Sequence, residues 1–126
     1  MSMNNIYLAV FLGSKTGAQR AAWDALSESA RAARQQAGMA AWGAWMAKHQ
    51  AAVLDTGGPL GKTKQITQRG IADVSNGMGA FALVRAESHE AAAKMFEDHP
   101  HFTIFPGDGV EVMPVLAIPS PQTDPK

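Results

Sequence analysis

The residues best suited to acid–base chemistry are two histidines in the segment Asp98-His99-Pro100-His101. An imidazole titrates near neutrality and can accept or donate a proton in a reaction. Pro100 fixes its own backbone angle, so it limits the directions in which the two imidazoles point. His99 or His101 is therefore a candidate general base, provided that an acid orients its second nitrogen. The alternative is a helix end at which both histidines cap carbonyl groups and face solvent.

A carboxylate and two lysines near a glycine-rich turn extend this set. Asp55 stands just before a Gly-Gly-Pro turn, where it either accepts backbone amide hydrogen bonds or acts as the acid partner of His99 or His101. Lys62 and Lys64 flank the turn and either lie in solvent or supply positive charge for a carboxylate or phenolate ligand. The catalytic candidates are His99, His101 and Asp55, and Lys64 is a ligand-binding candidate.

Large aromatic side chains form a second group of candidates. Trp42, Trp45 and Phe105 could make one wall for a flat ligand. Large side chains at helical spacing also make up cores and dimer interfaces, and that interpretation stays open. Gly43, between the two tryptophans, indicates the close approach of another backbone.

The sequence has no pattern typical of a cofactor site. The segment Gly57–Thr63 contains Gly-Lys-Thr, but the phosphate-loop spacing requires a glycine where Thr56 stands. No cysteine is present to hold zinc or an iron–sulfur cluster, and no two histidines stand four residues apart as they would on a metal-binding helix. We therefore predict no metal site and no cofactor.

Composition excludes several classes of partner. Eleven Lys and Arg balance eleven Asp and Glu, so no broad basic field is available for nucleic acid or an anionic membrane surface. No apolar run approaches the roughly 18 residues of a membrane span, and the N-terminus lacks a basic region ahead of a long apolar stretch. With 126 residues and 46% apolar content, the chain fits one domain. We predict a cytoplasmic protein with no nucleic-acid or membrane partner.

Predicted strands and helices alternate along the chain. Apolar runs and alternation predict strands at Ile6–Leu12, Lys64–Thr67, Ala80–Val84 and Val110–Ile118. Helical spacing predicts helices from Ala18 onward, from Met39 to about Gln50, and after Ser88.

Several residues mark the expected ends of these elements. Gly38 is expected to break or bend the first helical region, and Val53-Leu54 to form a helix end or a short strand. Asn76-Gly77 lies close to a hairpin signal. Ser88 is expected to cap the last helix and Pro100 to end it.

This order of elements predicts an α+β domain with the split β-α-β arrangement of ferredoxin-like folds. An antiparallel sheet with helices on one face leaves its other face uncovered, and a second copy of the chain is the simplest cover. We therefore expect a homodimer. The domain is predicted over residues 1–118, followed by a frayed, Pro-rich tail over residues 119–126.

Five segments carry a resemblance to the YCII-related family. They are Gly58–Leu60, Ala86–Ala92, Asp98–Phe102, Gly107 and Glu111–Pro114. The resemblance implies a ferredoxin-like fold, dimerisation into an α+β barrel, and a pocket lined by polar residues near the exit of the second helix. It also implies, for some members, activity on small cyclic compounds with a His–Asp pair.

Two functional hypotheses follow from the sequence. The first is an enzyme that acts on a small organic molecule, with His99 or His101 as base, Asp55 or Asp98 as orienting acid, and Lys64 stabilising charge. The second is a non-catalytic module that binds a small ligand or a protein partner. The second gains support because the helix histidine of the YCII-related family has no counterpart in this chain.

Overall fold

A computed structural model of the chain describes residues 5–119. Its elements follow one another in the order β1 (Ile6–Leu12), α1 (Ala18–Asp24), α2 (Glu28–Lys48), β2 (Val53–Pro59), β3 (Thr63–Thr67), β4 (Gly70–Val74), β5 (Met78–Arg85), α3 (His89–Lys94), α4 (Pro100–Thr103) and β6 (Gly109–Pro114). The first strand has the bounds that its apolar run predicted.

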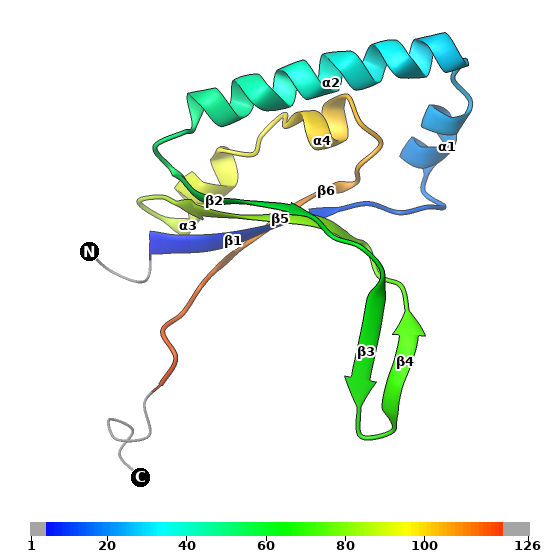
Figure 1. Cartoon of the computed structure of the whole chain (residues 1–126). Coiled ribbons are helices and arrows are strands. Elements are labelled where there is room, and N and C mark those ends of the chain that lie inside the picture. Colours follow the sequence, from blue (N-terminus) through cyan, green and yellow to red (C-terminus); the bar gives the residue numbers. More distant parts are fainter. Residues whose placement is uncertain (1–4, 120–126) are drawn as a thin grey trace.

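The main sheet has four antiparallel strands in the order β2-β5-β1-β6. The helices of the described chain lie on one face of this sheet (Figure 1). Each half of the domain therefore contributes a strand, a helical region and a second strand, and the two halves interleave in the sheet. The predicted fold class, an α+β ferredoxin-like domain with an antiparallel sheet, is confirmed.

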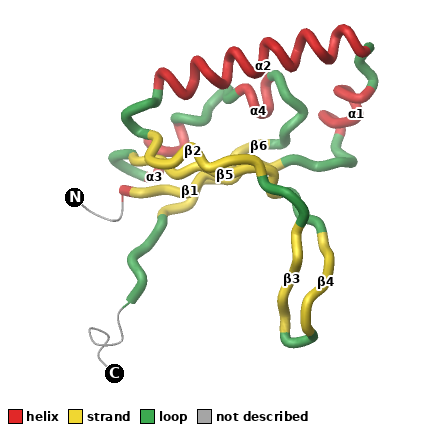
Figure 2. The backbone as a smooth tube through the Cα atoms, viewed as in Figure 1, coloured by secondary structure: helices red, strands yellow, loops and turns green. Residues whose placement is uncertain are grey.

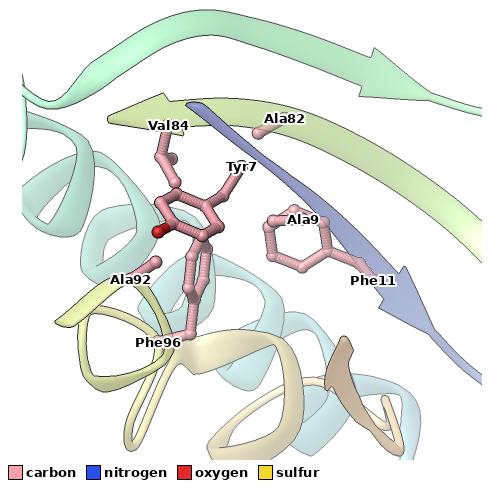
Figure 3. Packing of buried hydrophobic residues seen from close by; sticks show 7 residues of the cluster. All are labelled: Tyr7, Ala9, Phe11, Ala82, Val84, Ala92 and Phe96. Atoms are coloured by element: carbon pink, nitrogen blue, oxygen red, sulfur yellow. The ribbon is translucent and has the colours of Figure 1, made fainter. Parts of the chain in front are cut away.

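The core fills the space between the sheet and the helices (Figure 3). Alternate residues of β1 point to this side, because successive side chains of a strand face opposite ways. They meet small residues of β5 and the inner face of α3. The fully enclosed cluster consists of Tyr7, Ala9, Phe11, Ala82, Val84, Ala92 and Phe96.

The expected break at Gly38 is wrong, since α2 runs through this residue without interruption. The chain instead bends before Ser27, whose hydroxyl accepts a hydrogen bond from the Ala30 amide at 3.1 Å and so begins α2. Gly38 is buried, and a Cβ added there would lie 2.5 Å from the Phe105 ring. The glycine therefore serves close packing between α2 and Phe105.

The strand predicted at Lys64–Thr67 exists as β3, but it does not belong to the main sheet. It pairs with β4 in a separate two-stranded hairpin (Figure 2). The place next to β5 is taken by β2, where we expected only a helix end or a short strand. Asn76 does not form a hairpin turn: its side-chain oxygen accepts from the Met78 amide at 2.9 Å, a local turn that leads into β5.

At the C-terminal end of the domain, the cap of α3 is confirmed, because the Ser88 hydroxyl accepts from the Ala91 amide at 3.0 Å. Pro100 does not end this helix but begins α4, where a missing amide proton costs nothing. The last strand ends at Pro114, earlier than predicted. Residues 120–126 of the predicted tail lie outside the described residues.

Candidate functional site

His99 lies inside an aromatic enclosure at the centre of the domain. Its side chain has no solvent exposure. The imidazole contacts Trp42 edge-on with a centroid separation of 4.5 Å, and Trp45 at 4.9 Å. The rings of Phe11 and Phe96 follow at 5.2 and 5.8 Å. His99 is thus surrounded by apolar rings rather than by a cavity.

The two ring nitrogens of His99 have different surroundings. Nδ1 accepts a hydrogen bond from the His101 backbone amide at 3.0 Å, so it caps the start of α4. Nε2 therefore carries the proton of the neutral ring, and it has no hydrogen-bond partner in the described part of the chain. Burial, followed by the charges of His101 and His49, lowers the pKa of His99 to about 4. His99 is consequently neutral at pH 7.

His101 occupies a different position, at the edge of the core. Its Nε2 lies 2.7 Å from the carbonyl oxygen of Leu12, the last residue of β1. The ring packs edge-on against Phe11 with a centroid separation of 5.4 Å. It also lies against Gly107, where an added Cβ would come 2.3 Å from Nε2. Contacts on several sides therefore hold the imidazole in one orientation.

This contact also decides which nitrogen of His101 is available. A carbonyl oxygen only accepts hydrogen bonds, so Nε2 must carry the proton that points to Leu12. Nδ1 is then the unprotonated nitrogen of the neutral ring, and no group in residues 5–119 bonds to it. His101 can therefore accept a proton or a hydrogen bond through Nδ1.

A cavity of about 940 Å³ opens beside His101. It lies where β1 and β2 end and β5 begins, and its walls come from the loop after β1, the base of the β3–β4 hairpin and the loop after α4. Glycines at 13, 77, 79 and 107 line it, so backbone groups as well as side chains face a ligand. Its size is that of a pocket for a small organic molecule.

The charged groups that line this cavity are mostly positive. Lys64 pairs with Asp73 at 2.6 Å, and Arg20 pairs with Asp24 at 3.3 Å. Lys15 and Lys62 also line the cavity, and neither makes an ion pair within the described residues. The cavity therefore attracts an anion rather than a cation.

The other predicted site residues lie elsewhere. Asp55 is exposed and accepts a hydrogen bond from the Gly57 amide at 2.8 Å, as a turn-stabilising aspartate does. It does not line the cavity of His101. Trp45 belongs to the packed interior, where its Nε1 donates to the Met95 carbonyl at 2.7 Å.

Trp42 and Phe105 do come together, with their ring centroids 6.1 Å apart. They line a shallow hollow of about 470 Å³ with Met39 and Gly43. A Cβ added at Gly43 would meet no atom within 4 Å, so the expected close approach of another backbone is wrong within this chain. Phe105 is also part of the cavity wall near His101.

Two features of the His101 site were not predicted from the sequence. The carbonyl of Leu12 and the absent side chain of Gly107 both carry no chemical signal of their own. Lys15, in the loop after β1, was also missed, although its position just after Leu12-Gly13-Ser14 places it near the end of a strand. Ends of strands in such sheets are common places for ligands, and this signal was available.

Residues 5–119 contain no group of three histidine, aspartate or glutamate side chains placed to hold a metal ion. Within the same residues, no helix has the length and apolar character needed to cross a membrane.

The fold and site together define an α+β ferredoxin-like domain with a positively charged cavity beside a fixed histidine. The chain matches no family model, and no curated protein matches it. Among solved structures it is similar to the 5-chloro-2-hydroxyhydroquinone dehydrochlorinase (TftG) of Burkholderia phenoliruptrix AC1100 in complex with 2,5-dihydroxybenzoquinone. The TM-score is 0.49 at 18% identity, over 88% of this chain and 93% of that one. The fold assignment itself rests on the strand order described above.

Proposed function

We propose that this protein binds a small anionic or acidic organic molecule in the cavity and that His101 accepts a proton from it. The observation that carries the proposal is the fixed hydrogen bond from His101 Nε2 to the Leu12 carbonyl. It commits one nitrogen to the protein, and we assign the lone pair of Nδ1 to a ligand in the cavity that His101 lines.

The surrounding charges suit this step. When a phenol or a similar acid transfers its proton to Nδ1, an anion and an imidazolium form together. The Leu12 carbonyl oxygen stabilises the imidazolium, because it accepts the Nε2 proton. Lys62 and Lys15 stabilise the anion on the ligand side. The reaction class is therefore proton transfer on a small acidic molecule, the step on which an enzyme of this kind would build.

Binding of 4-nitrophenol tests the proposal, because its phenolate is coloured and its protonation state is read directly. We expect the wild-type protein to lower the pKa of bound 4-nitrophenol by about 1, since opposite charges nearby favour the anion. Replacing His101 by Gln removes the acceptor nitrogen and should weaken binding roughly tenfold or more. Lys62→Ala should reduce the pKa change of the probe while retaining part of the binding.

Nitrobenzene is the matched control probe, since it has the ring and nitro group but no acidic proton. Gln36→Ala is the control variant, because Gln36 is exposed on α2 and does not line the cavity. Equal binding of the two probes, or unchanged binding of 4-nitrophenol by His101→Gln, would show that His101 does not act as the acceptor.

A second candidate function is binding without catalysis. It is favoured by one observation, namely that a backbone carbonyl and not a carboxylate orients His101. Asp55, one of the two acids that we considered for the pair, bonds to its own turn, which is the alternative role that we gave for it. A protein that holds the phenolate of the probe but leaves every candidate substrate unchanged would be such a binding module.

We also propose that the chain is a YCII-related protein that forms a homodimer in the cytoplasm. Membership rests on the motifs around Gly58-Pro59 and His99-Pro100-His101. Dimerisation is supported by the apolar face of the sheet that the helices leave uncovered, and cytoplasmic location by composition alone. Sedimentation velocity over a range of concentrations tests the oligomeric state.

A further inference from the structure

The β3–β4 hairpin is the part of the fold that the function so far leaves unused. It pairs only with itself and projects from the sheet on the side away from the helices (Figure 1). An isolated two-stranded hairpin is marginally stable in water at best. A hairpin of five-residue strands that extends into solvent is therefore expected to lie against something.

The outer end of the hairpin presents an apolar pair. Ile66 and Ile71 stand opposite each other in the register, and each is 71% exposed. They share a face of the hairpin with Lys64 and Asp73, since residues two positions apart on a strand point the same way. The opposite face carries Gln65 and Ala72 at the neighbouring position. Only one face of the arm thus offers large apolar side chains.

The sheet face on the same side is also apolar, and no helix of the described chain lies on it, although Val10 there is only 8% exposed (Figure 1). The core takes alternate residues of β1 and β5, so the residues between them point away from the helices. In the register these form a row across the sheet, from Leu83 through Leu8 to Met113, next to the pair of Phe81 and Val10. Met113 is 40% exposed.

The charges on this face favour a second copy of the chain as the occupant. Arg85 and Glu111 point to the same side as the apolar row, and both are exposed. Neither forms an ion pair within residues 5–119. A two-fold interface presents the same surface twice, so it can pair Arg85 of one copy with Glu111 of the other. Equal numbers of acidic and basic residues leave little net repulsion between copies.

We propose that the β3–β4 hairpin is an arm that packs its Ile66–Ile71 face on a second copy of the chain, and that this contact fixes the hairpin wall of the cavity. The second part rests on the proposed function. Lys62, Lys64 and Asp73 at the base of the hairpin line the cavity, so the position of the arm sets the positions of these charges. The site is then complete only in the dimer.

The test compares two double variants that each add two lysines to the hairpin. Ile66→Lys with Ile71→Lys changes the apolar face, and Gln65→Lys with Ala72→Lys adds the same charge to the opposite face. By sedimentation velocity, the first pair should raise the dimer dissociation constant at least about tenfold, because two large apolar side chains lose their burial. The second pair should stay within about threefold of wild type, which is the change expected from rim charges. Thermal unfolding of both variants checks that the fold is intact.

Binding of 4-nitrophenol then tests the coupling. The Ile66→Lys, Ile71→Lys protein should bind the probe weakly at concentrations at which it is a monomer and recover as it is concentrated into the dimer. Equal dissociation constants for the two double variants, or a wild-type protein that stays monomeric, would overturn the proposal that the hairpin packs on a second copy. Weaker association with unchanged probe binding would overturn the coupling. A wild-type dimer that does not bind the probe would count against the proposed function and leave the result for the arm intact.

Discussion

His99 and His101 stand two residues apart and end in opposite kinds of environment. His99 is enclosed by four aromatic rings and uses Nδ1 to cap a helix, which leaves a proton on Nε2 with no acceptor among residues 5–119. His101 reaches a cavity and uses Nε2 to bond to Leu12, which leaves Nδ1 unprotonated. The two side chains thus commit opposite nitrogens to the protein.

The difference shows what decides the role of a histidine. Both residues belong to one tight turn around Pro100, and the amide of His101 is the donor to His99. Burial lowers the pKa of the core-facing ring of His99, whereas His101 has an Nδ1 that bonds to no group in residues 5–119 and lines a cavity together with Lys15 and Lys62. The first position therefore serves stability, and the second is the one we propose for chemistry.

Removing the enclosure of His99 should have the largest effect on the protein. Phe96 is 3% exposed and contacts Phe11, Trp45 and His99. Phe96→Ala is expected to lower the free energy of unfolding by about 3–5 kcal/mol, as for other buried phenylalanines. Denaturant titration measures this loss, with Gln36→Ala, at an exposed position of α2, as the control. A loss under about 1 kcal/mol would show that the aromatic cluster is not a packed core.

Lowering the pH should reduce the free energy of unfolding through protonation of His99, by somewhat less than the Phe96→Ala substitution does. Its pKa is about 4 in the folded protein, below the ordinary histidine value of 6.5, so the unfolded chain takes up a proton at a higher pH than the folded protein does. The contribution of neutral His99 to the free energy of unfolding is complete above pH 6.5 and is lost as the pH falls towards 4. The total loss is about 3 kcal/mol.

The variant His99→Asn isolates this contribution, because Asn can keep the helix cap but does not titrate. We expect the wild-type protein to lose more unfolding free energy than His99→Asn between pH 7 and pH 4, whatever the difference at pH 7. Parallel curves of unfolding free energy against pH would mean that His99 takes up its proton over the same pH range in the folded and unfolded protein.

Sequence patterns gave the fold correctly where one element carries one strong signal. The apolar run Ile6–Leu12 and the Ser88 cap were both found. Gly38 and Asn76 were misjudged because a glycine or asparagine marks either the end of an element or a place with a local requirement for packing space or for a hydrogen bond. In the first case the need was room for the Phe105 ring, and in the second a hydrogen bond to Met78. Such needs arise only when distant segments meet.

The candidate site was predictable to the same degree. The segment Asp98–His101 was recognised as its most reactive part, yet nothing in it distinguishes the inward from the outward histidine. That distinction depends on Leu12, 89 residues away from His101, and on the Trp42 ring beside His99. Asp55 was a candidate acid because of its residue type, but its carboxylate accepts a hydrogen bond from the Gly57 amide in its own turn.

The smallest expected effect on stability, and the sharpest on the site, comes from Gly107. A methyl group there would overlap the His101 ring at 2.3 Å from Nε2, so the imidazole must leave the Leu12 carbonyl. We expect Gly107→Ala to lower the unfolding free energy by about 1–3 kcal/mol, the usual range for overpacking. It should also abolish the change in the pKa of bound 4-nitrophenol, since Nδ1 no longer has a fixed direction. The pH dependence contributed by His99 should remain, because the aromatic enclosure is untouched. If Gly107→Ala instead left the pKa of the bound probe unaffected and changed the pH dependence contributed by His99, His101 would not be the histidine that acts on the ligand.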